Sequence, residues 1–457
     1  MTAPTAADVP TEQGPRRAAR LTLVLASLGF FLITLDILIV NVALTTIGRE
    51  LGGSTSGLQW VIDAYTLLFA SLLLFAGNLS ERIGAKRAIG WGIAGFLVAS
   101  VACSLAPTLG ALIAARAFQG AAAAVMLPAS MALIREAFPD ARERAHALGI
   151  WAVGGAVAGA VGPILGGALT TLDWRLVFAI NLPVCAAMLV MLARVAPSPR
   201  RPARFDPAGQ VLALLALAGL VFGLIEGGAT GFDRWYVVVA LVLAAVAVAG
   251  FLLVQAHGRN PMMPLDLFRS GRMRIALGVG FAFMVGNFGS VFVLSLYLQQ
   301  HLGLSPLAAG LVFLPSAAFS IVGNIVSGTL VNRFGARVPV VAGLTTMAIG
   351  IVVMIVLAPY DSVVAVAVCT ILTGAGGSVA MPPATSVVLA SVPAERSGTA
   401  SAVFNTFRQV GGAVAIAVFG AFLADRSQFV VGTQTSFVVA AAVLVVAALA
   451  SMRIRTE

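Results

Sequence analysis

The sequence predicts an all-α polytopic membrane protein with fourteen membrane-spanning helices, from its composition and from the length of its apolar segments. Of the 457 residues, 60% are hydrophobic and only 10% are charged, and the mean hydropathy is +1.01. Soluble domains average about 45–50% apolar and about 25% charged residues. This chain has too few polar side chains to cover a water-exposed globule, which excludes a cytosolic enzyme, a secreted disulfide scaffold and a disordered chain.

The apolar segments have the length of helices that cross a bilayer, which requires roughly 20 residues each. They are continuous and do not alternate between polar and apolar residues, which favours helices over a β-barrel. The expected spans, in chain order, are 21–46, 57–77, 87–106, 109–133, 145–170, 176–195, 207–226, 235–256, 274–297, 306–331, 338–358, 362–391, 398–424 and 433–452.

The basic residues predict how these spans are oriented. Of the 28 lysines and arginines, four lie in connections from odd to even spans and two lie inside spans. The other 22 lie in the terminal tails and in or beside the connections from even to odd spans, on the other side of the membrane. Because basic loops stay in the cytoplasm, both termini are expected to be cytoplasmic, in the cytoplasmic (inner) membrane of a bacterium. The net charge of +10 therefore reflects topology, and no nucleic-acid partner is expected.

The chain also repeats part of its own sequence. The segment 77–87 closes the second span and is similar to the segment 328–337, which closes the tenth. Both copies lie in cytoplasmic loops and run in the same direction, which predicts two parallel six-helix bundles plus two extra central helices. The expected organisation is a cytoplasmic tail 1–20, an N-terminal bundle 21–195, a two-helix insert with flanking loops 196–273, a C-terminal bundle 274–452 and a second tail 453–457.

Four ionisable residues lie within the expected spans: Asp36, Asp63, Arg116 and Arg408. Each costs roughly 2.5–3.5 kcal/mol to insert, so each is a functional candidate. With a rise of ~1.5 Å per residue, the first three are expected in the outer half of the membrane, where one water-accessible vestibule can serve them all. A carboxylate there suits a proton-coupled cation exporter, because a proton and a cation compete for the same site.

Structural roles for these residues stay open as alternatives. Asp36 and Arg116 alternatively form a static ion pair that only organises the helices. Asp63 alternatively lies in the wet interface close to Trp60, and Arg408 alternatively has a structural role.

The loop after the second span carries a family signature. The pattern glycine-x-leucine-x-acid-arginine-x-glycine-x-basic-basic resembles the loop-2/3 motif of the major facilitator superfamily, with Glu81 in place of the usual aspartate. The motif residues are Gly77, Glu81, Arg82, Gly84 and Arg87. A tight glycine turn beside a carboxylate that pairs with nearby arginines is suited to latch one conformation. The alternative is a solvated loop.

Two further motifs resemble those of exporters in this superfamily. Arg116 and Gln119 resemble the fourth-span motif, whose arginine is implicated in proton coupling. The fifth span resembles the antiporter motif, with Gly149, Gly162, Pro163, Gly166 and Gly167. Glycine and proline there allow a kink and close helix approach. The alternative is packing of small residues with no functional meaning.

Segments 35–44, 174–183, 206–209 and 398–409 resemble the fourteen-span drug:proton antiporters. The resemblance implies a major facilitator fold and proton-coupled efflux of lipophilic, cationic drugs or toxic compounds by alternating access. It also implies a monomer that uses the proton-motive force, with no cofactor and no catalytic or metal-binding residues. A dedicated exporter of a single natural product or metabolite is the alternative. A membrane enzyme is disfavoured because no acidic or histidine cluster and no sizeable loop is visible. A non-transporting receptor is a third, less favoured alternative to the exporters.

Several polar and aromatic residues are candidates to line a substrate cavity. Aromatic and thioether groups at helical spacing in the ninth span suit flat hydrophobic cations. Such a stripe alternatively faces lipid or belongs to the packed core. The candidates are Asn41, Trp60, Tyr65, Gln119, Phe281, Met284, Asn287, Phe288 and Phe292.

Overall fold

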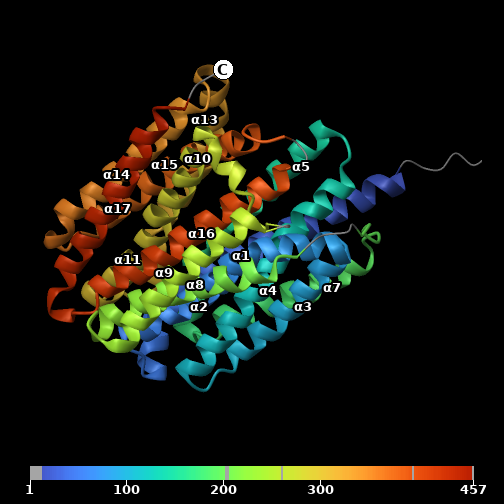
Figure 1. Ribbon diagram of the computed structural model, residues 1–457. Helices are drawn as coiled ribbons and strands as arrows, with labels where there is room; N and C mark the ends of the chain where they lie inside the picture. Colours follow the sequence, from blue (N-terminus) through green and yellow to red (C-terminus); the bar gives the residue numbers. More distant parts are fainter. Residues whose placement is uncertain (1–12, 201–204, 259–260, 394–395, 455–457) are drawn as a thin grey trace, which may run out of the picture.

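The computed structural model describes residues 13–200, 205–258, 261–393 and 396–454. Within these residues, fourteen helices are long and apolar enough to cross a membrane, and the described chain contains no β-strand. The predicted fold class and number of spans are thereby confirmed. Figure 1 shows the helices running side by side along the long direction of the molecule.

Spans one to six form the N-terminal half, and spans seven and eight form a helical hairpin that we call the insert. The N-terminal half contains α1 (Gln13–Leu51), α2 (Thr55–Ile83), α3 (Ala85–Ser104), α4 (Leu109–Ala137), α5 (Ala141–Leu172), α6 (Leu176–Ala179) and α7 (Asn181–Ala193). The insert contains α8 (Pro207–Thr230) and α9 (Trp235–His257).

Spans nine to fourteen form the C-terminal half. Its elements are η1 (Leu265–Arg269), α10 (Gly271–Met284), η2 (Val285–Gly289), α11 (Ser290–Leu296), η3 (Tyr297–His301), α12 (Pro306–Val312), α13 (Leu314–Phe334), α14 (Arg337–Leu357), η4 (Ala358–Tyr360), α15 (Val363–Ala390), α16 (Ser397–Phe422), η6 (Arg426–Gln428) and α17 (Phe429–Ser451).

Proline divides two of the spans into shorter helices. Pro183 has no N–H to donate to the carbonyl four residues earlier, and the sixth span is interrupted between α6 and α7 at Ile180. Pro315 likewise follows the interruption of the tenth span at Phe313. The sequence predicted both spans as single runs.

Two helices begin earlier than the boundaries expected from the sequence. The tail was expected to extend to residue 20, but α1 already begins at Gln13, and residues 1–12 lie outside the described residues. The part of α1 that is apolar enough to cross a membrane begins at Ala18. The C-terminal bundle begins three residues before the expected position, at Gly271, because the Ser270 side chain caps α10.

The repeated loop motif has the same backbone conformation in both copies. Gly84 follows α2 with φ +89°, and Gly335 follows α13 with φ +72°. Residues with a Cβ rarely adopt this left-handed conformation, whereas glycine adopts it at little cost. The internal repeat seen in the sequence is therefore present as an equivalent turn in the two halves.

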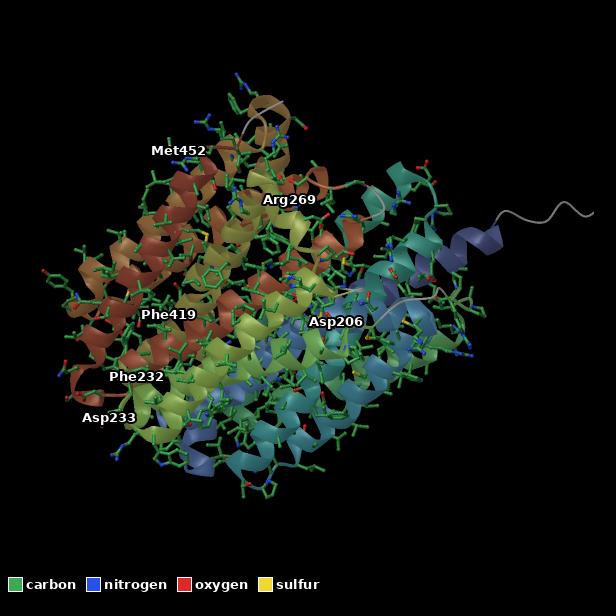
Figure 2. All side chains as sticks on the ribbon, in the orientation of Figure 1. Asp206, Phe232, Asp233, Arg269, Phe419 and Met452 are labelled. Atoms are coloured by element: carbon green, nitrogen blue, oxygen red, sulfur yellow. The ribbon has the colours of Figure 1, made fainter. Side chains whose placement is uncertain are left out.

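The insert packs across the junction of the two halves. Apolar residues of α8 form a buried cluster with residues of α2 and α16, and Figure 1 shows α8 and α9 lying in front of these helices. Figure 2 labels Asp206 and Asp233 near the two ends of α8. The Asp206 side chain caps α8 and accepts a hydrogen bond from Gln255 of α9 at 2.6 Å, which closes the hairpin.

Candidate functional site

Five polar side chains from four helices form a buried cluster inside the N-terminal half. Arg116 forms an ion pair with Asp36, and both side chains are fully buried. Gln119 donates to the other Asp36 oxygen at 2.9 Å, and Asn181 donates to that oxygen at 2.9 Å. The Ser100 hydroxyl accepts from Gln119 at 3.0 Å and from Asn181 at 3.3 Å. The sequence predicted the first pair and Gln119 but did not select Ser100 or Asn181 as site residues.

The guanidinium of Arg116 has further partners in the same half. Its Nε donates to the Val61 carbonyl at 3.0 Å, and its Nη1 donates to Gln119 at 2.7 Å. It lies 4.4 Å from the ring centroid of Tyr65 and 5.8 Å from that of Phe178. Two buried charges are costly unless hydrogen bonds satisfy them. Here both carboxylate oxygens accept hydrogen bonds, and the Nε and Nη1 of the guanidinium donate, whereas its Nη2 has no hydrogen-bond partner among the described residues. This arrangement organises spans one, two, three, four and six.

Asp63 lies apart from this cluster. Its side chain is fully buried, and neither carboxylate oxygen has a hydrogen-bond partner among the described residues. Gln59 lies one helical turn earlier on α2 and reaches α16, whereas Val61 and Tyr65 contact α4. Because residues four apart share a helix face, Asp63 lies on the side of α2 that faces the other half. The shared vestibule expected for Asp63 and the cluster is therefore not open in this conformation.

The neighbouring residue Trp60 connects α2 to the insert. Its Nε1 donates to the Glu226 carboxylate at 3.0 Å, and its ring lies 6.1 Å from that of Phe222. Glu226 lies near the C-terminal end of α8. The Glu226 side chain is half-buried, because the insert packs on α2 and brings the end of α8 to Trp60.

Polar contacts join the two halves at the end of the molecule opposite the termini. Gln59 of α2 donates to the carbonyls of Ile416 and Ala417, both at 3.0 Å. The Ser295 hydroxyl donates to the Asn41 carbonyl at 2.9 Å, and Gln299 donates to the Val42 carbonyl at 3.0 Å. Figure 1 shows the far ends of α5 and α13 standing apart at the end where the C-terminus is marked.

The glycine-rich motif of α5 permits two close backbone contacts. On one face, a Cβ at Gly166 would lie 2.6 Å from the Ile39 carbonyl of α1. On another, a Cβ at Gly167 would lie 2.5 Å from the Pro306 carbonyl of the C-terminal half. Gly162 also packs on α1, whereas a Cβ at Gly149 would meet no atom within 4 Å.

Span ten makes the reciprocal contact with α5. A Cβ at Gly310 would lie 2.2 Å from the carbonyl oxygen of Pro163. Real Cβ atoms essentially never approach another atom this closely. Of the predicted motif residues, Pro163 and Gly167 thus lie at the junction of the halves, whereas Gly162 and Gly166 pack on α1 within the N-terminal half.

The loop after α2 is held by a different set of contacts from the one predicted. Glu81 is exposed and has no ion-pair partner in the described part of the chain. Lys86 instead donates its backbone N–H to the Ser198 hydroxyl at 2.9 Å, and that hydroxyl donates to Glu136 at 2.5 Å. Arg82 stacks over the Phe205 ring at 5.0 Å.

The two motif glycines and the last arginine of the loop differ in their surroundings. A Cβ at Gly84 would lie 3.0 Å from the Ser198 carbonyl, whereas one at Gly77 would meet nothing within 4 Å. Arg87 is exposed. The loop therefore packs on the segment that leads to the insert.

The candidate residues of span nine do not form one continuous face. A π-helical turn over Val285–Gly289 contains Asn287 and Phe288 and shifts the helical phase. Phe281 and Phe288 are half-buried, whereas Met284 and Phe292 are buried. Phe288 packs against the hydrophobic core of the N-terminal half, so this candidate residue lies at the junction.

Arg408 of α16 lies beside span nine. Its Nη1 donates to Asn405 at 3.2 Å, and its guanidinium lies 5.7 Å from the Phe283 ring and 6.0 Å from the Phe404 ring. No carboxylate pairs with it in the described segments, and its Nε has no partner there. In those segments, no group of three or more histidine, cysteine, aspartate or glutamate residues is arranged to hold a metal ion.

Comparison with known proteins places this arrangement in a family. Residues 26–416 and 276–457 match the Major Facilitator Superfamily. The chain belongs to the major facilitator superfamily. A crystal structure of a bacterial homologue of the human lysosomal transporter Spinster, in an inward-facing and unoccupied conformation, shares the fold with a TM-score of 0.67. That similarity covers 95% of this chain and 96% of the other, at 18% identity.

Relatives within the major facilitator superfamily are drug-resistance proteins. The multidrug resistance protein Stp of Mycobacterium tuberculosis is 39% identical over 412 residues, which cover 89% of this chain and 76% of Stp. The methylenomycin A resistance protein of Streptomyces coelicolor is 37% identical over 411 residues, which cover 90% and 86% of the two chains. These similarities confirm the family expected from the motifs.

Proposed function

We propose that this protein exports lipophilic, cationic drugs or toxic compounds across the cytoplasmic membrane of a bacterium, in exchange for protons. Export of toxic compounds is the activity that the names of its resistance-protein relatives suggest. The protein acts as a monomer with both termini in the cytoplasm, requires no cofactor and is driven by the proton-motive force. The excess of basic residues in the connections on one side supports this orientation.

The buried carboxyl group of Asp63 carries the proposal. It lies on the face of α2 toward α16 and has no partner in the described residues. An isolated buried charge is costly, so the group requires a proton or a cation when the interface is closed. A proton and a cationic substrate then exclude one another at this position, which is the requirement for exchange.

Alternating access follows from where the halves touch. Gln59 and Ser295 join the halves at the end opposite the termini, and α5 meets α12 backbone to backbone at the same end. This end is external in the proposed orientation. A rocking movement that breaks these contacts uncovers Asp63 toward the outside, where its proton or cation is exchanged.

Cationic-dye transport in proteoliposomes tests the proposal. The purified protein is reconstituted, a pH gradient is imposed, and dye flux is compared for wild type, Asp63→Asn and the control Asp233→Asn, an exposed acid in the loop between α8 and α9. We expect gradient-driven flux in wild type and in the control, and loss of the gradient dependence in Asp63→Asn. Wild-type flux that ignores the gradient would refute proton coupling, and normal coupling in Asp63→Asn would refute the site.

A dedicated exporter of one natural product is the second candidate. It is favoured by the similarity to the methylenomycin A resistance protein. Drug-accumulation assays with a panel of unrelated cations separate the two functions. Protection against several unrelated compounds supports a multidrug exporter, and protection against one compound alone supports a dedicated exporter.

A further inference from the structure

A groove lies within the C-terminal half between α10 and α17, near the end that carries the C-terminus. Its volume is about 1190 Å³. Lining residues between 270 and 282 follow the groove along span nine. With a rise of ~1.5 Å per residue, this part of the helix is about 18 Å long. That length slightly exceeds half of the roughly 30 Å hydrocarbon core of a bilayer. The groove therefore has the depth of one membrane leaflet.

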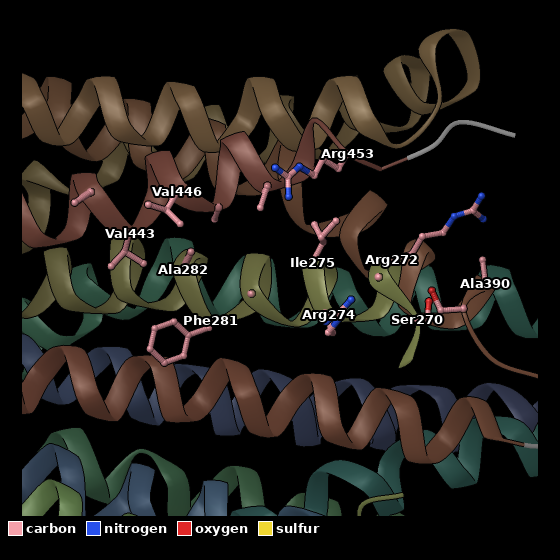
Figure 3. Close-up of a pocket in the computed structure, with 16 residues that line it drawn as sticks. Ser270, Arg272, Arg274, Ile275, Phe281, Ala282, Ala390, Val443, Val446 and Arg453 are labelled. Atoms are coloured by element: carbon pink, nitrogen blue, oxygen red, sulfur yellow. The ribbon is translucent and has the colours of Figure 1, made fainter. Parts of the chain in front are cut away.

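The walls of the groove are apolar and formed mainly by small side chains. Figure 3 shows Ala282 of α10 opposite Val443 and Val446 of α17. A Cβ at Gly278 would meet no other atom within 4 Å, and Ala447 adds a second small residue to the lining. Small residues on two facing helices leave space for an apolar chain.

The end of the groove near the membrane surface is basic. Figure 3 shows Arg272, Arg274 and Arg453 at this end, away from Val443 and Val446. Arg274 and Arg453 are exposed, and no acidic side chain is among the residues that line the groove. Arginine pairs with phosphate oxygens through two parallel hydrogen bonds, and basic pockets between membrane helices bind anionic headgroups.

We propose that this groove binds an anionic phospholipid. The phosphate of the lipid contacts Arg274 and Arg453, and one of its acyl chains lies along Gly278, Ala282 and Val446. A cationic substrate of the kind proposed above is disfavoured here, because the arginines repel it. A second copy of this chain is also disfavoured, because it would bring further arginines to the same membrane surface.

Native mass spectrometry of the full-length protein tests this inference. Delipidated protein in neutral detergent is titrated with phosphatidylglycerol, with phosphatidylcholine of the same acyl chains, and separately with inorganic phosphate. We expect wild type to bind phosphatidylglycerol in preference to phosphatidylcholine, and not to retain phosphate alone. Equal binding of the two lipids, or retention of phosphate alone, would overturn the inference, and so would a dimer that must dissociate before lipid binds.

Paired variants locate the site. The double variant Arg274→Gln/Arg453→Gln is expected to lose about five-fold in phosphatidylglycerol affinity for each charge removed, or about 25-fold together. The control Arg194→Gln/Arg337→Gln removes two exposed arginines from the same end outside the groove and is expected to bind as wild type. Equal losses in both double variants would mean that surface charge alone attracts the lipid.

A second variant tests the apolar part of the groove without changing its charge. Gly278→Leu fills the groove, and the open space around this position leaves the fold intact. The control Gly110→Leu places the same side chain at an exposed position with equal space in the first turn of α4. We expect weaker binding of both lipids in Gly278→Leu only, with unchanged circular dichroism. Unchanged lipid binding in Gly278→Leu would contradict an acyl chain in the groove.

Discussion

Substitution of Gly310 by alanine is expected to open the junction of the two halves. The new Cβ would lie 2.2 Å from the carbonyl oxygen of Pro163, and the nearest atoms of α5 are backbone atoms that cannot rotate away. Overpacking of this kind costs about 1–3 kcal/mol. Since the contact exists only when this end is closed, the cost falls on the closed conformation and changes the ratio of closed to open molecules by about 5-fold to 150-fold.

Distances between spin labels on the two halves measure this shift. Leu105 in the N-terminal half and Tyr360 in the C-terminal half lie at the same end and are 74% and 75% exposed, so a label at each position does not disturb packing. The native cysteines at positions 103, 185 and 369 are buried and protected from labelling. We expect double electron–electron resonance to show a longer distance population in Gly310→Ala than in wild type.

Gly110→Ala is the matched control, because a Cβ there meets no atom within 4 Å. Its distance distribution should coincide with that of wild type. Gly167→Ala should behave as Gly310→Ala, since its Cβ would lie 2.5 Å from the Pro306 carbonyl on the other side of the same junction. If both junction variants keep the wild-type distribution, the close backbone contact does not hold this end closed.

Three further variants probe the interactions that hold the helices together, all measured as melting temperatures in detergent. Asp36→Asn leaves Arg116 buried without a counter-ion, so we expect the free energy of unfolding to fall by about 3–5 kcal/mol. The double variant Asp36→Asn/Arg116→Gln should recover part of this loss. An unchanged melting temperature in Asp36→Asn would contradict the prediction. Trp60→Phe removes the hydrogen bond to Glu226, at a cost of about 1.5–3 kcal/mol, whereas Glu226→Gln keeps an acceptor and should melt closer to wild type. Gly84→Ala forces alanine to φ +89°, at about 1–3 kcal/mol, and wild-type melting would show that the turn relaxes freely.

The fold could be predicted from the sequence because membrane insertion strongly restricts the amino-acid composition of each spanning helix. Every span needs about 20 apolar residues, and all fourteen were found near the expected positions. The internal repeat was also readable, because Gly84 and Gly335 occupy a turn that only glycine adopts easily. The breaks at Ile180 and Phe313 were not predicted, because proline is tolerated inside many membrane helices, such as α4 with Pro128.

The site was predicted in part, for a similar reason. Asp36 and Arg116 were selected because charges inside a span are costly. Ser100 and Asn181 are neutral and carry no comparable cost. Asn181 lies in the segment 174–183 that resembles the antiporters, but that resemblance did not mark it as a site residue, and no sequence signal marked Ser100. The direction in which Asp63 points was also hidden, because it depends on how α2 packs between α4 and α16.

Span nine shows a second limit of sequence patterns. The spacing of Phe281, Met284, Phe288 and Phe292 was interpreted with a regular α-helical period. The π-helical turn over Val285–Gly289 adds a residue to one turn and rotates everything that follows. Phe292 is buried and Phe281 is half-buried, and both pack in the same hydrophobic cluster.

The partners of the two buried carboxylates indicate different roles during a rocking movement. Every partner of Asp36 named above, including Arg116 and Asn181, belongs to the N-terminal half. A rigid rotation of one half against the other leaves these contacts unchanged, so this cluster is suited to hold the half together. Asp63 faces the other half and has no hydrogen-bond partner in the described part of the chain, so the same rotation changes its surroundings completely. A group whose environment changes with conformation is the one that can link proton binding to movement, which favours Asp63 over Asp36 as the coupling residue.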